Sequence, residues 1–469
     1  MKLKLESSSP FWVLANYSVS KSLMAAKFFM AASFLGPELM GVAGLLLIIY
    51  AISEALTEFG LIHAIIQSDK EPLNVDLDSV WWSLSLRGAC LAFFLIIFGY
   101  LYPIDEKYSC SFIVSAILIG FSALSKSMYS PNFYKAQRRR SFNKIFAHGV
   151  VGGLTDICFT VYFLISSFEV ISLFIGLFSS ELIKLLSSYF LFGDDTRAIA
   201  RIKSPVFNIK KYVHFSKWIW LGNCNNLILN QSDKLLTGTL LGVQQLGLYQ
   251  MSNRVAQLCI SDVSMAFGQY LFPTFSRLNS KPKSELYTYF SRSICLMMLF
   301  AFGSATSLVF FANLLPVILG QEWQGSVLLL QILSISMSIG ALISVLVAFL
   351  RAIGHPKFVT IASFFQLIVF LPSMSILGYL YGIIGIAVST IISTATCLLT
   401  LFYLSPVPTY ETFRAFRLYF KPVLGYSLVY SVIYLFKESI TAIVLGIINL
   451  GVLALCTFII EKKKNESTY

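Results

Sequence analysis

Apolar runs of about 20 residues recur along this chain and constrain its fold more than any other feature of the sequence. They fall near residues 16–35, 40–62, 79–101, 110–130, 145–166, 169–191, 212–232, 247–273, 290–312, 326–350, 357–378, 381–404, 418–436 and 440–460. A helix of roughly 20 apolar residues crosses the hydrocarbon core of a bilayer, which is about 30 Å thick. The pattern therefore predicts an all-α, polytopic membrane protein with about fourteen transmembrane helices.

The composition excludes a soluble fold and indicates neither a metal nor a nucleic-acid partner. Hydrophobic residues make up 57% of the chain and charged residues only 12%, whereas a soluble domain carries roughly a quarter charged residues. The net charge of +12 is spread over short connectors, where Lys and Arg orient membrane helices. The cysteines form no C-x-x-C pair and the histidines show no ligand spacing, so we expect no metal site and no cofactor.

The connectors predict the orientation of the chain and argue against an enzyme. Most Lys and Arg residues, including the cluster from Lys135 to Lys144, fall on the side of the membrane that holds both termini. Because cytoplasmic loops carry the excess of basic residues, we expect both termini in the cytoplasm and a location in the bacterial inner membrane. No connector is long enough for a catalytic domain, and no phosphate-binding loop of the form G-x-x-x-x-G-K-[ST] occurs.

A short motif occurs twice, at corresponding places in the predicted topology. Residues 35–42 read LGPELMGV and residues 241–248 read LGVQQLGL, and a weaker pair links 136–142 with 352–358. Two similar six-helix halves around a cavity are a transporter plan. The pattern predicts one lobe over 1–200 (helices 1–6), a pseudo-symmetric lobe over 201–407 (helices 7–12), and helices 13 and 14 with a cytoplasmic tail over 408–469. Coincidence is the alternative, because Gly and Leu are common in membrane chains.

Several cations fall within the predicted helices, where each costs about 2.5–3.5 kcal/mol on insertion scales and so needs a reason to be there. The candidates for holding a dense anion such as a diphosphate are Lys21, Lys27, Arg87 and Arg254. Ion pairing within the protein is the alternative. The pairs considered are Lys27 with Glu54, Arg254 with Asp262 or Asp233, and Lys184 with Glu181.

Amides and acids supply the remaining candidate site residues. Asn223, Asn226 and Asn230 share one helix face at the i, i+3, i+7 spacing. Amides supply the donors and acceptors that sugar hydroxyls require, but they also join membrane helices to each other, and both interpretations stay open. The acids at membrane depth that could couple transport to an ion are Glu54, Asp156 and Asp262.

Short motifs in a fixed order resemble the polysaccharide-unit flippases of the multidrug/oligosaccharidyl-lipid/polysaccharide exporter superfamily. They are LGPE with Gly41 at 35–41, EFGL at 58–61, AIIQ at 64–67, AQR at 136–138, FNK at 142–144, DKLL at 233–236, GLY at 247–249, FP at 272–273 and RAIGHPK at 351–357. The resemblance covers nearly the whole chain. Some relatives place arginines on the first helix where this chain has lysines, which changes the expected contact with phosphate.

The resemblance implies a cavity that opens alternately to each side of the membrane. Its expected cargo is an undecaprenyl-diphosphate-linked oligosaccharide, moved from the cytoplasmic to the outer leaflet for O-antigen, exopolysaccharide or teichuronic-acid synthesis. The expected partners are this lipid-linked oligosaccharide, the bilayer, and polysaccharide polymerase or assembly proteins. The alternative is a multidrug or organic-cation exporter of the same superfamily.

Overall fold

A computed structural model of the chain describes residues 10–58, 74–139, 141–192 and 210–405. The described residues are helical with short connectors and contain no β-strand. The chain divides into two compact units, unit 1 over Met1–Gly247 and unit 2 over Leu248–Tyr469. The predicted lobe boundary between residues 200 and 201 differs from this division. That boundary rests on sequence symmetry rather than on packing, and it stays a prediction.

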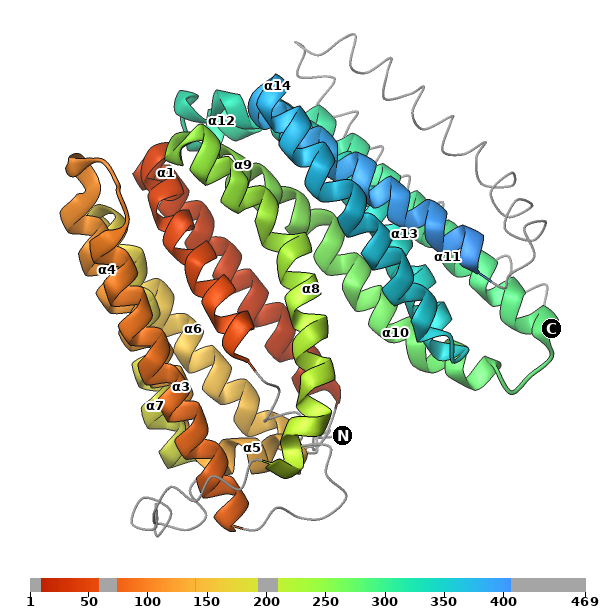
Figure 1. The fold of residues 1–469 in the computed structure, drawn as a ribbon, viewed down its shortest axis with the longest axis horizontal. Helices are drawn as coiled ribbons and strands as arrows, with labels where there is room; N and C mark the ends of the chain where they lie inside the picture. The colour runs from red at the N-terminus through yellow and green to blue at the C-terminus, as the bar shows by residue number, and fades with distance from the viewer. Residues whose placement is uncertain (1–9, 59–73, 140, 193–209, 406–469) are drawn as a thin grey trace, which may run out of the picture. The chain divides into compact units, whose positions relative to one another are not determined.

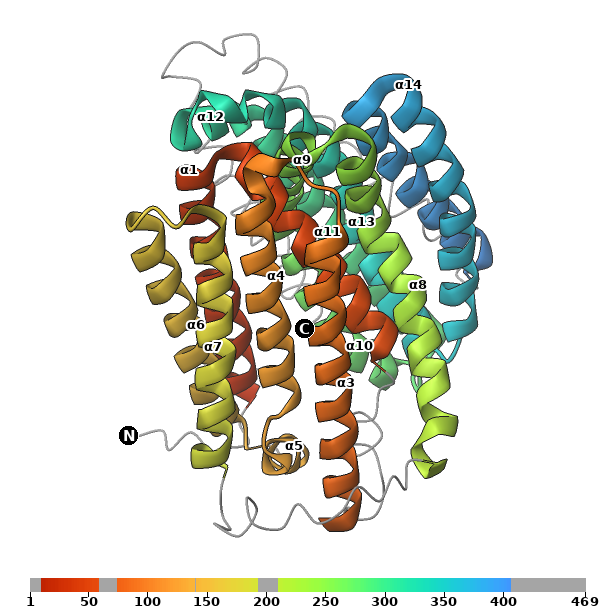
Figure 2. The same cartoon turned by 60° about the vertical axis from the view of Figure 1, so that its left-hand side comes forward.

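The described residues of unit 1 form six long helices and one short one, which Figures 1 and 2 show from two sides. They are α1 (Pro10–Thr57), α3 (Asn74–Leu101), α4 (Glu106–Ser127), α5 (Pro131–Arg138), α6 (Phe142–Ile165), α7 (Glu169–Leu191) and α8 (Lys210–Leu241). Helix α7 packs against α6 and α4, while α1 packs against α6 and α8. Figure 2 shows the short helix α5 at the same end of the unit as the ends of α4 and α7.

Unit 2 is organised around one central helix. After α9 (Val243–Ala256), which begins in unit 1, come η2 (Gln257–Ser261), α10 (Asp262–Leu278), α11 (Lys283–Phe311), α12 (Leu314–Leu319), η3 (Gln321–Gly325), α13 (Ser326–Ala352) and α14 (Pro356–Leu404). Helix α13 packs against α10, α11 and α14. Its Phe349 is fully buried and lies 4.4 Å from the Phe290 ring and 5.4 Å from the Phe275 ring, centroid to centroid.

Eight of the described helices are long and apolar enough to cross a membrane. Two of them, α1 with 48 residues and α14 with 49 residues, are about twice the length that one crossing needs. Each holds one glycine with non-helical φ and ψ, Gly36 in α1 and Gly382 in α14. The break at Gly36 falls between predicted spans 16–35 and 40–62, and the break at Gly382 falls at the beginning of predicted span 381–404, just after span 357–378. The predicted spans 418–436 and 440–460 lie outside the described residues.

Helix α8 and the run from α9 through α10 do not meet the same length and hydropathy criterion. The reason is their polar content, since α8 carries a row of Asn, Gln and Lys residues and α9 carries four amide side chains and Arg254. The expected spans 212–232 and 247–273 are therefore helical, as predicted, but less apolar than the other membrane helices. The total of about fourteen crossings stays a prediction.

The two copies of the repeated motif play matching backbone roles at their helix ends. Gly36 has φ 67° and Gly242 has φ 88°, a left-handed conformation that residues with a Cβ adopt only with strain. In the first copy Pro37 follows the break and suits the first turn of the next helical leg, because it has no backbone N–H to satisfy. In both copies the first glycine is therefore the point at which one helix ends and the next begins.

The second glycine of each copy brings the two copies into direct contact within unit 1. A Cβ added to Gly41 would lie 1.7 Å from the carbonyl oxygen of Val243. A Cβ added to Gly247 would lie 1.8 Å from the carbonyl oxygen of Pro37. Because both obstacles are backbone atoms, neither position admits a side chain without movement of a helix. The two motifs are therefore in contact, and their origin from a repeat stays a prediction.

Candidate functional site

The most deeply buried cation of the described part of unit 1, Lys27 on α1, forms an ion pair between helices. Its Nζ lies 2.6 Å from Oδ1 of Asp156 on α6 and donates a second bond of 3.4 Å to the carbonyl of Leu173 on α7. Lys27 is only 8% exposed. A charge buried to this degree is tolerated when it is paired and hydrogen-bonded. The expected alternative pairing of Lys27 with Glu54 is wrong, because α1 presents Lys27 to α6 and α7.

Glu54 instead pairs with Lys126 at the end of α4. The Lys126 Nζ lies 2.5 Å from Oε1 of Glu54. Arg87 of α3 donates to the Thr57 hydroxyl at 3.1 Å and to the carbonyl of Glu54 at 3.1 Å. These bonds join α1, α3 and α4 at one end of the helices. Lys126 was not among the expected site residues, and its pairing with Glu54, 72 residues earlier in the chain, follows from helix packing rather than from local spacing.

A third group of polar side chains connects α4, α6 and α7. Glu181 accepts a hydrogen bond from the Tyr129 hydroxyl and pairs with Lys184 at 2.9 Å, as predicted from their spacing. The aliphatic stem of Lys184 packs against Gly152 of α6, where an added Cβ would meet it at 2.2 Å. Gly152 therefore makes the space that the Lys184 side chain occupies.

These groups form one electrostatic set, which we call the unit 1 polar network. Its members are Lys27, Glu54, Arg87, Lys126, Tyr129, Asp156, Glu181 and Lys184. The charged groups interact electrostatically across the three pairs: Lys184 repels the ammonium of Lys27, and Glu181 attracts the ammonium of Lys126. Lys27, a candidate for diphosphate binding, and Glu54 and Asp156, candidates for ion coupling, are thus engaged in ion pairs inside the unit.

Lys21 lies on the same helix as Lys27 but contacts a different neighbour. Its Nζ lies over the ring of Tyr17, 5.6 Å from the centroid. Lys21 and Lys27 are six residues apart, and at 3.6 residues per turn their side chains leave the helix about 120° apart. The two lysines therefore point to different neighbours, and a shared contact with one phosphate group would need α1 to turn.

In unit 2 the expected site residues Arg254 and Asp262 lie on the two sides of a π-helical turn. The turn is η2, between α9 and α10, and such turns are frequent at functional sites. The Arg254 Nη1 donates to Oε1 of Gln257 at 3.2 Å, and Asp262 is the acidic group that acts on the guanidinium. The electrostatic interaction between Arg254 and Asp262 agrees with one of the two expected pairings.

The Arg254 guanidinium keeps hydrogen-bonding capacity inside the unit. Its Nη2 is buried and has no hydrogen-bond partner within the described part of the chain. A buried donor without a partner costs about 1–3 kcal/mol, and more when it is charged. An anionic oxygen brought to Nη2 would remove that cost. Sequence alone indicated the residue type here but not the π-helical turn.

The row of amides on α8 is only partly described. Asn230 is exposed, and its carbonyl accepts a bond of 2.9 Å from Lys234 Nζ one turn later. The shared face that Asn223 and Asn226 would form with Asn230 stays a prediction. Both interpretations of the amides, sugar binding and helix association, remain open.

Comparison with known proteins places these features in a family. The sequence profile of the family described as polysaccharide biosynthesis protein matches residues 30–328, more than half of the chain. The chain is 24% identical over 408 residues to the lipopolysaccharide biosynthesis protein WzxC of Escherichia coli (strain K12), covering 81% of this chain and 74% of WzxC.

Solved structures with similar folds come from two kinds of transporter. The lipid II flippase MurJ, in an inward closed conformation, superimposes with a TM-score of 0.69 and 15% identity over 97% of this chain and 99% of MurJ. An inward-facing multidrug resistance transporter of the MATE family gives 0.65 and 16% over 86% of this chain and 98% of that one. At such identity these likenesses show the fold alone. The profile match shows that this chain belongs to the polysaccharide biosynthesis protein family.

Proposed function

We propose that this protein moves an undecaprenyl-diphosphate-linked oligosaccharide repeat unit from the cytoplasmic to the outer leaflet of the bacterial inner membrane. The family match over residues 30–328 carries the proposal. The cargo cannot cross hydrocarbon unaided, because its hydroxyls and charges would lose their water. The inside-negative membrane potential favours outward movement of an anion by about 2.3 kcal/mol per charge per 100 mV.

The architecture that we propose has fourteen membrane helices, in lobes over 1–200 and 201–407, followed by helices 13 and 14 over 408–469. Both termini are cytoplasmic. The contact between Glu38 and Lys107, 3.8 Å apart, supports the assigned topology, because both residues are expected outside. Lys126 and Arg87 both contact Glu54.

In this arrangement the contact between Gly41 and Gly247 closes the outer end of the transport path. Gly41 follows the turn between helices 1 and 2, and Gly247 follows the turn between helices 7 and 8. These turns belong to different lobes of the proposed repeat. Alternating access needs the lobes to separate at one end while they meet at the other. Because the two glycines have no side chains, the backbones can approach closely when this end is closed and can separate without moving any interlocked side chain.

Arg254 is the residue that we propose for holding the cargo's diphosphate. Its buried Nη2, unpartnered among the described residues, can donate to a phosphate oxygen, and a guanidinium suits phosphate geometry. Lys21, Lys27 and Arg87 are weaker candidates. Lys27 and Arg87 already bond within unit 1, and Lys21 points away from Lys27. Among the candidate ion-coupling acids, Asp262 interacts electrostatically with Arg254, so the binding of an anion to Arg254 would change the charge that Asp262 experiences.

Export of organic cations is the second candidate function, favoured by the fold likeness to a multidrug transporter. Such an exporter attracts its cargo with carboxylates. Two of the expected intramembrane acids, Glu54 and Asp156, are in ion pairs at 2.5 and 2.6 Å. Their charges are therefore offset by lysines rather than available to a cation.

Deletion of the gene in its host tests the two functions against each other. We expect lipid-linked repeat units to accumulate inside the cell and the surface polysaccharide to be lost, because the cargo no longer reaches the outer leaflet. Susceptibility to organic cations such as ethidium is expected to stay unchanged. A plasmid copy of the gene is the control. An intact surface polysaccharide together with increased ethidium sensitivity would instead favour the cation exporter.

A further inference from the structure

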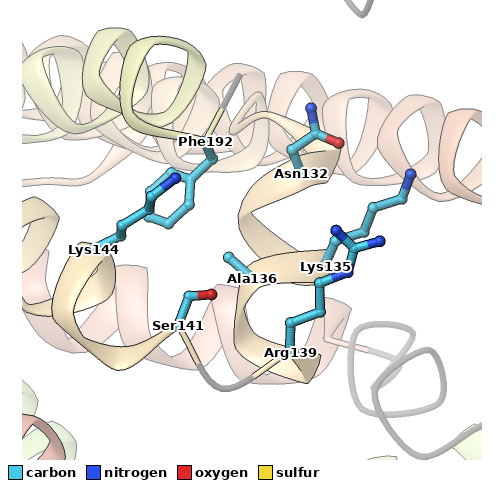
Figure 3. A pocket seen from close by; sticks show the side chains of 7 residues that line it. All are labelled: Asn132, Lys135, Ala136, Arg139, Ser141, Lys144 and Phe192. Atoms are coloured by element: carbon cyan, nitrogen blue, oxygen red, sulfur yellow. The ribbon is translucent and has the colours of Figure 1, made fainter. Parts of the chain in front are cut away.

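A basic pocket lies at the junction of α5, α6 and α7 in unit 1. It encloses about 210 Å³ and takes its charge from Lys135 on α5, from Arg139 directly after α5, and from Lys144 on α6. Figure 3 shows α5 supplying one side of the pocket and the beginning of α6 the other. Asn132 and Ser141 add polar groups to the lining. None of the described lining residues is acidic, so the pocket is suited to an anion.

Aromatic side chains pack against one another along the walls of the pocket. Its apolar side is Phe192, a buried residue at the end of α7. The Phe133 ring of α5 lies 5.3 Å from the Phe192 ring and 4.9 Å from the His148 ring of α6. The buried Tyr134 also anchors α5, and burial raises its pKa to about 12, so its phenol stays neutral. A site fixed in this way is formed before its ligand arrives.

The start of α6 adds to the attraction for an anion. Helix α6 begins at Phe142, directly after the pocket residue Ser141, whose side chain makes no capping hydrogen bond. The N-terminus of a helix carries about half a positive charge and presents backbone N–H groups to anions. The Ser141 hydroxyl is therefore placed to donate to an anionic oxygen beside Lys144.

The position of the pocket along the helices indicates where its ligand comes from. The pocket lies at the ends of three long helices. Its residues fall between the end of α4 at Ser127 and the first turn of α6, which begins at Phe142, and directly after the end of α7 at Leu191. All three helices are long and apolar enough to cross the membrane. Their ends therefore lie in the headgroup layer, where basic pockets between membrane helices bind anionic lipid headgroups. The volume is smaller than the roughly 300–1,000 Å³ of a drug-sized site.

We propose that this pocket binds a phosphate group, supplied by the headgroup of an anionic phospholipid of the bilayer. Arg139 and Lys144 hold the phosphate from opposite sides, and the Ser141 hydroxyl donates to it. Lys135 contributes less because it also faces Asp78 on α3. The lipid would pin the α4–α5–α6 connection to the membrane surface. The proposal does not depend on the identity of the transported cargo.

Lipid-dependent stability of the purified, delipidated full-length protein tests the proposal. Phosphatidylglycerol is expected to raise the unfolding midpoint, and phosphatidylcholine, which has no net charge, is expected to raise it far less. The double variant Arg139→Ala/Lys144→Ala is expected to bind phosphatidylglycerol about 10- to 30-fold more weakly, as expected for the loss of two cations near a membrane surface. If the double variant does not fold, the single variant Lys144→Gln replaces it in the same measurement and is expected to weaken phosphatidylglycerol binding in the same direction.

A neighbouring arginine gives the matched control. Arg138 is the last residue of α5 and directly precedes Arg139, but it does not line the pocket, so Arg138→Ala is expected to keep the full shift with phosphatidylglycerol. Equal shifts with inorganic phosphate would overturn the lipid source and assign the pocket to a soluble phosphate. An equal response of the double variant and the unaltered protein to phosphatidylglycerol would overturn the proposal altogether.

Discussion

Replacing Asp156 with leucine is expected to lower the stability of the protein by about 3–5 kcal/mol. The change leaves the buried ammonium of Lys27 without its carboxylate 2.6 Å away, and removing one partner of a buried pair carries a cost of this size. The remaining bond to the Leu173 carbonyl, at 3.4 Å, does not neutralise the charge. The unfolding midpoint in detergent measures the loss.

The double variant Lys27→Met/Asp156→Leu distinguishes the cost of an orphaned charge from the value of the pair. Apolar residues of similar volume often replace a buried pair without loss of stability, so the midpoint is expected to return to near that of the unaltered protein. Glu38→Gln is the control, because it breaks an exposed pair with Lys107 and is expected to leave the midpoint unchanged. A double variant as unstable as the Asp156→Leu variant would contradict the pairing.

The same double variant separates a structural lysine from a ligand-binding lysine. If Lys27 only joins α1 to α6 and α7, transport is expected to recover together with stability. A stable double variant that transports nothing would show that Lys27 also contacts the cargo. The structure favours recovery, because the carboxylate and a backbone carbonyl already bind the Lys27 ammonium.

Adding a single methyl group at Gly41 or at Gly247 is expected to destabilise the protein by about 3 kcal/mol. Overpacking costs up to this much when neighbours must move, and here each added Cβ meets a backbone carbonyl, at 1.7 and 1.8 Å. Transport is expected to fall as well, since the contact that closes the proposed outer end would no longer form. Unfolding midpoints and transport rates of Gly41→Ala and Gly247→Ala measure both effects.

Two comparisons make this result specific to the contact. The double variant is expected to lose less than the two single losses combined, because the first Cβ already separates the turns. Gly340→Ala on α13 is the control, since its added Cβ meets nothing within 4 Å among the described residues and alanine favours a helix by up to about 1 kcal/mol. Strictly additive losses at Gly41 and Gly247 would contradict a shared contact.

The sequence predicted the helical architecture because apolar length is a local property. It also identified the repeated glycine motif, but not the use of each glycine. Gly36 and Gly242 carry positive φ angles, which follows from their places at helix ends. The direct contact between Gly41 and Gly247 joins segments about 200 residues apart, and no local pattern could reveal it.

The ion pairs show the same limit for the candidate site. Lys184 and Glu181 are three residues apart on one helix, and their pairing followed from helical spacing. Lys27 and Asp156 are separated by 129 residues, so their pairing depends on how α1 packs against α6. Without that packing, Lys27 could be assigned equally well to Glu54 or to a ligand. The basic pocket likewise depends on packing, because the fold brings Phe192 to the basic cluster of residues 135–144. From the sequence alone, that cluster indicated only how the chain is oriented in the membrane.

Transport by vesicles that contain the purified protein tests the central proposal most directly. A labelled undecaprenyl-diphosphate oligosaccharide from the host is offered on the cytoplasmic-equivalent face, and its arrival on the other face is followed with time. Arg254→Ala is expected to slow arrival about 10- to 100-fold, as expected for the loss of a hydrogen bond to a charged group. Arg277→Ala, an exposed arginine on α10, should transport normally. Arrival that is as fast in vesicles without the protein would contradict the flippase function.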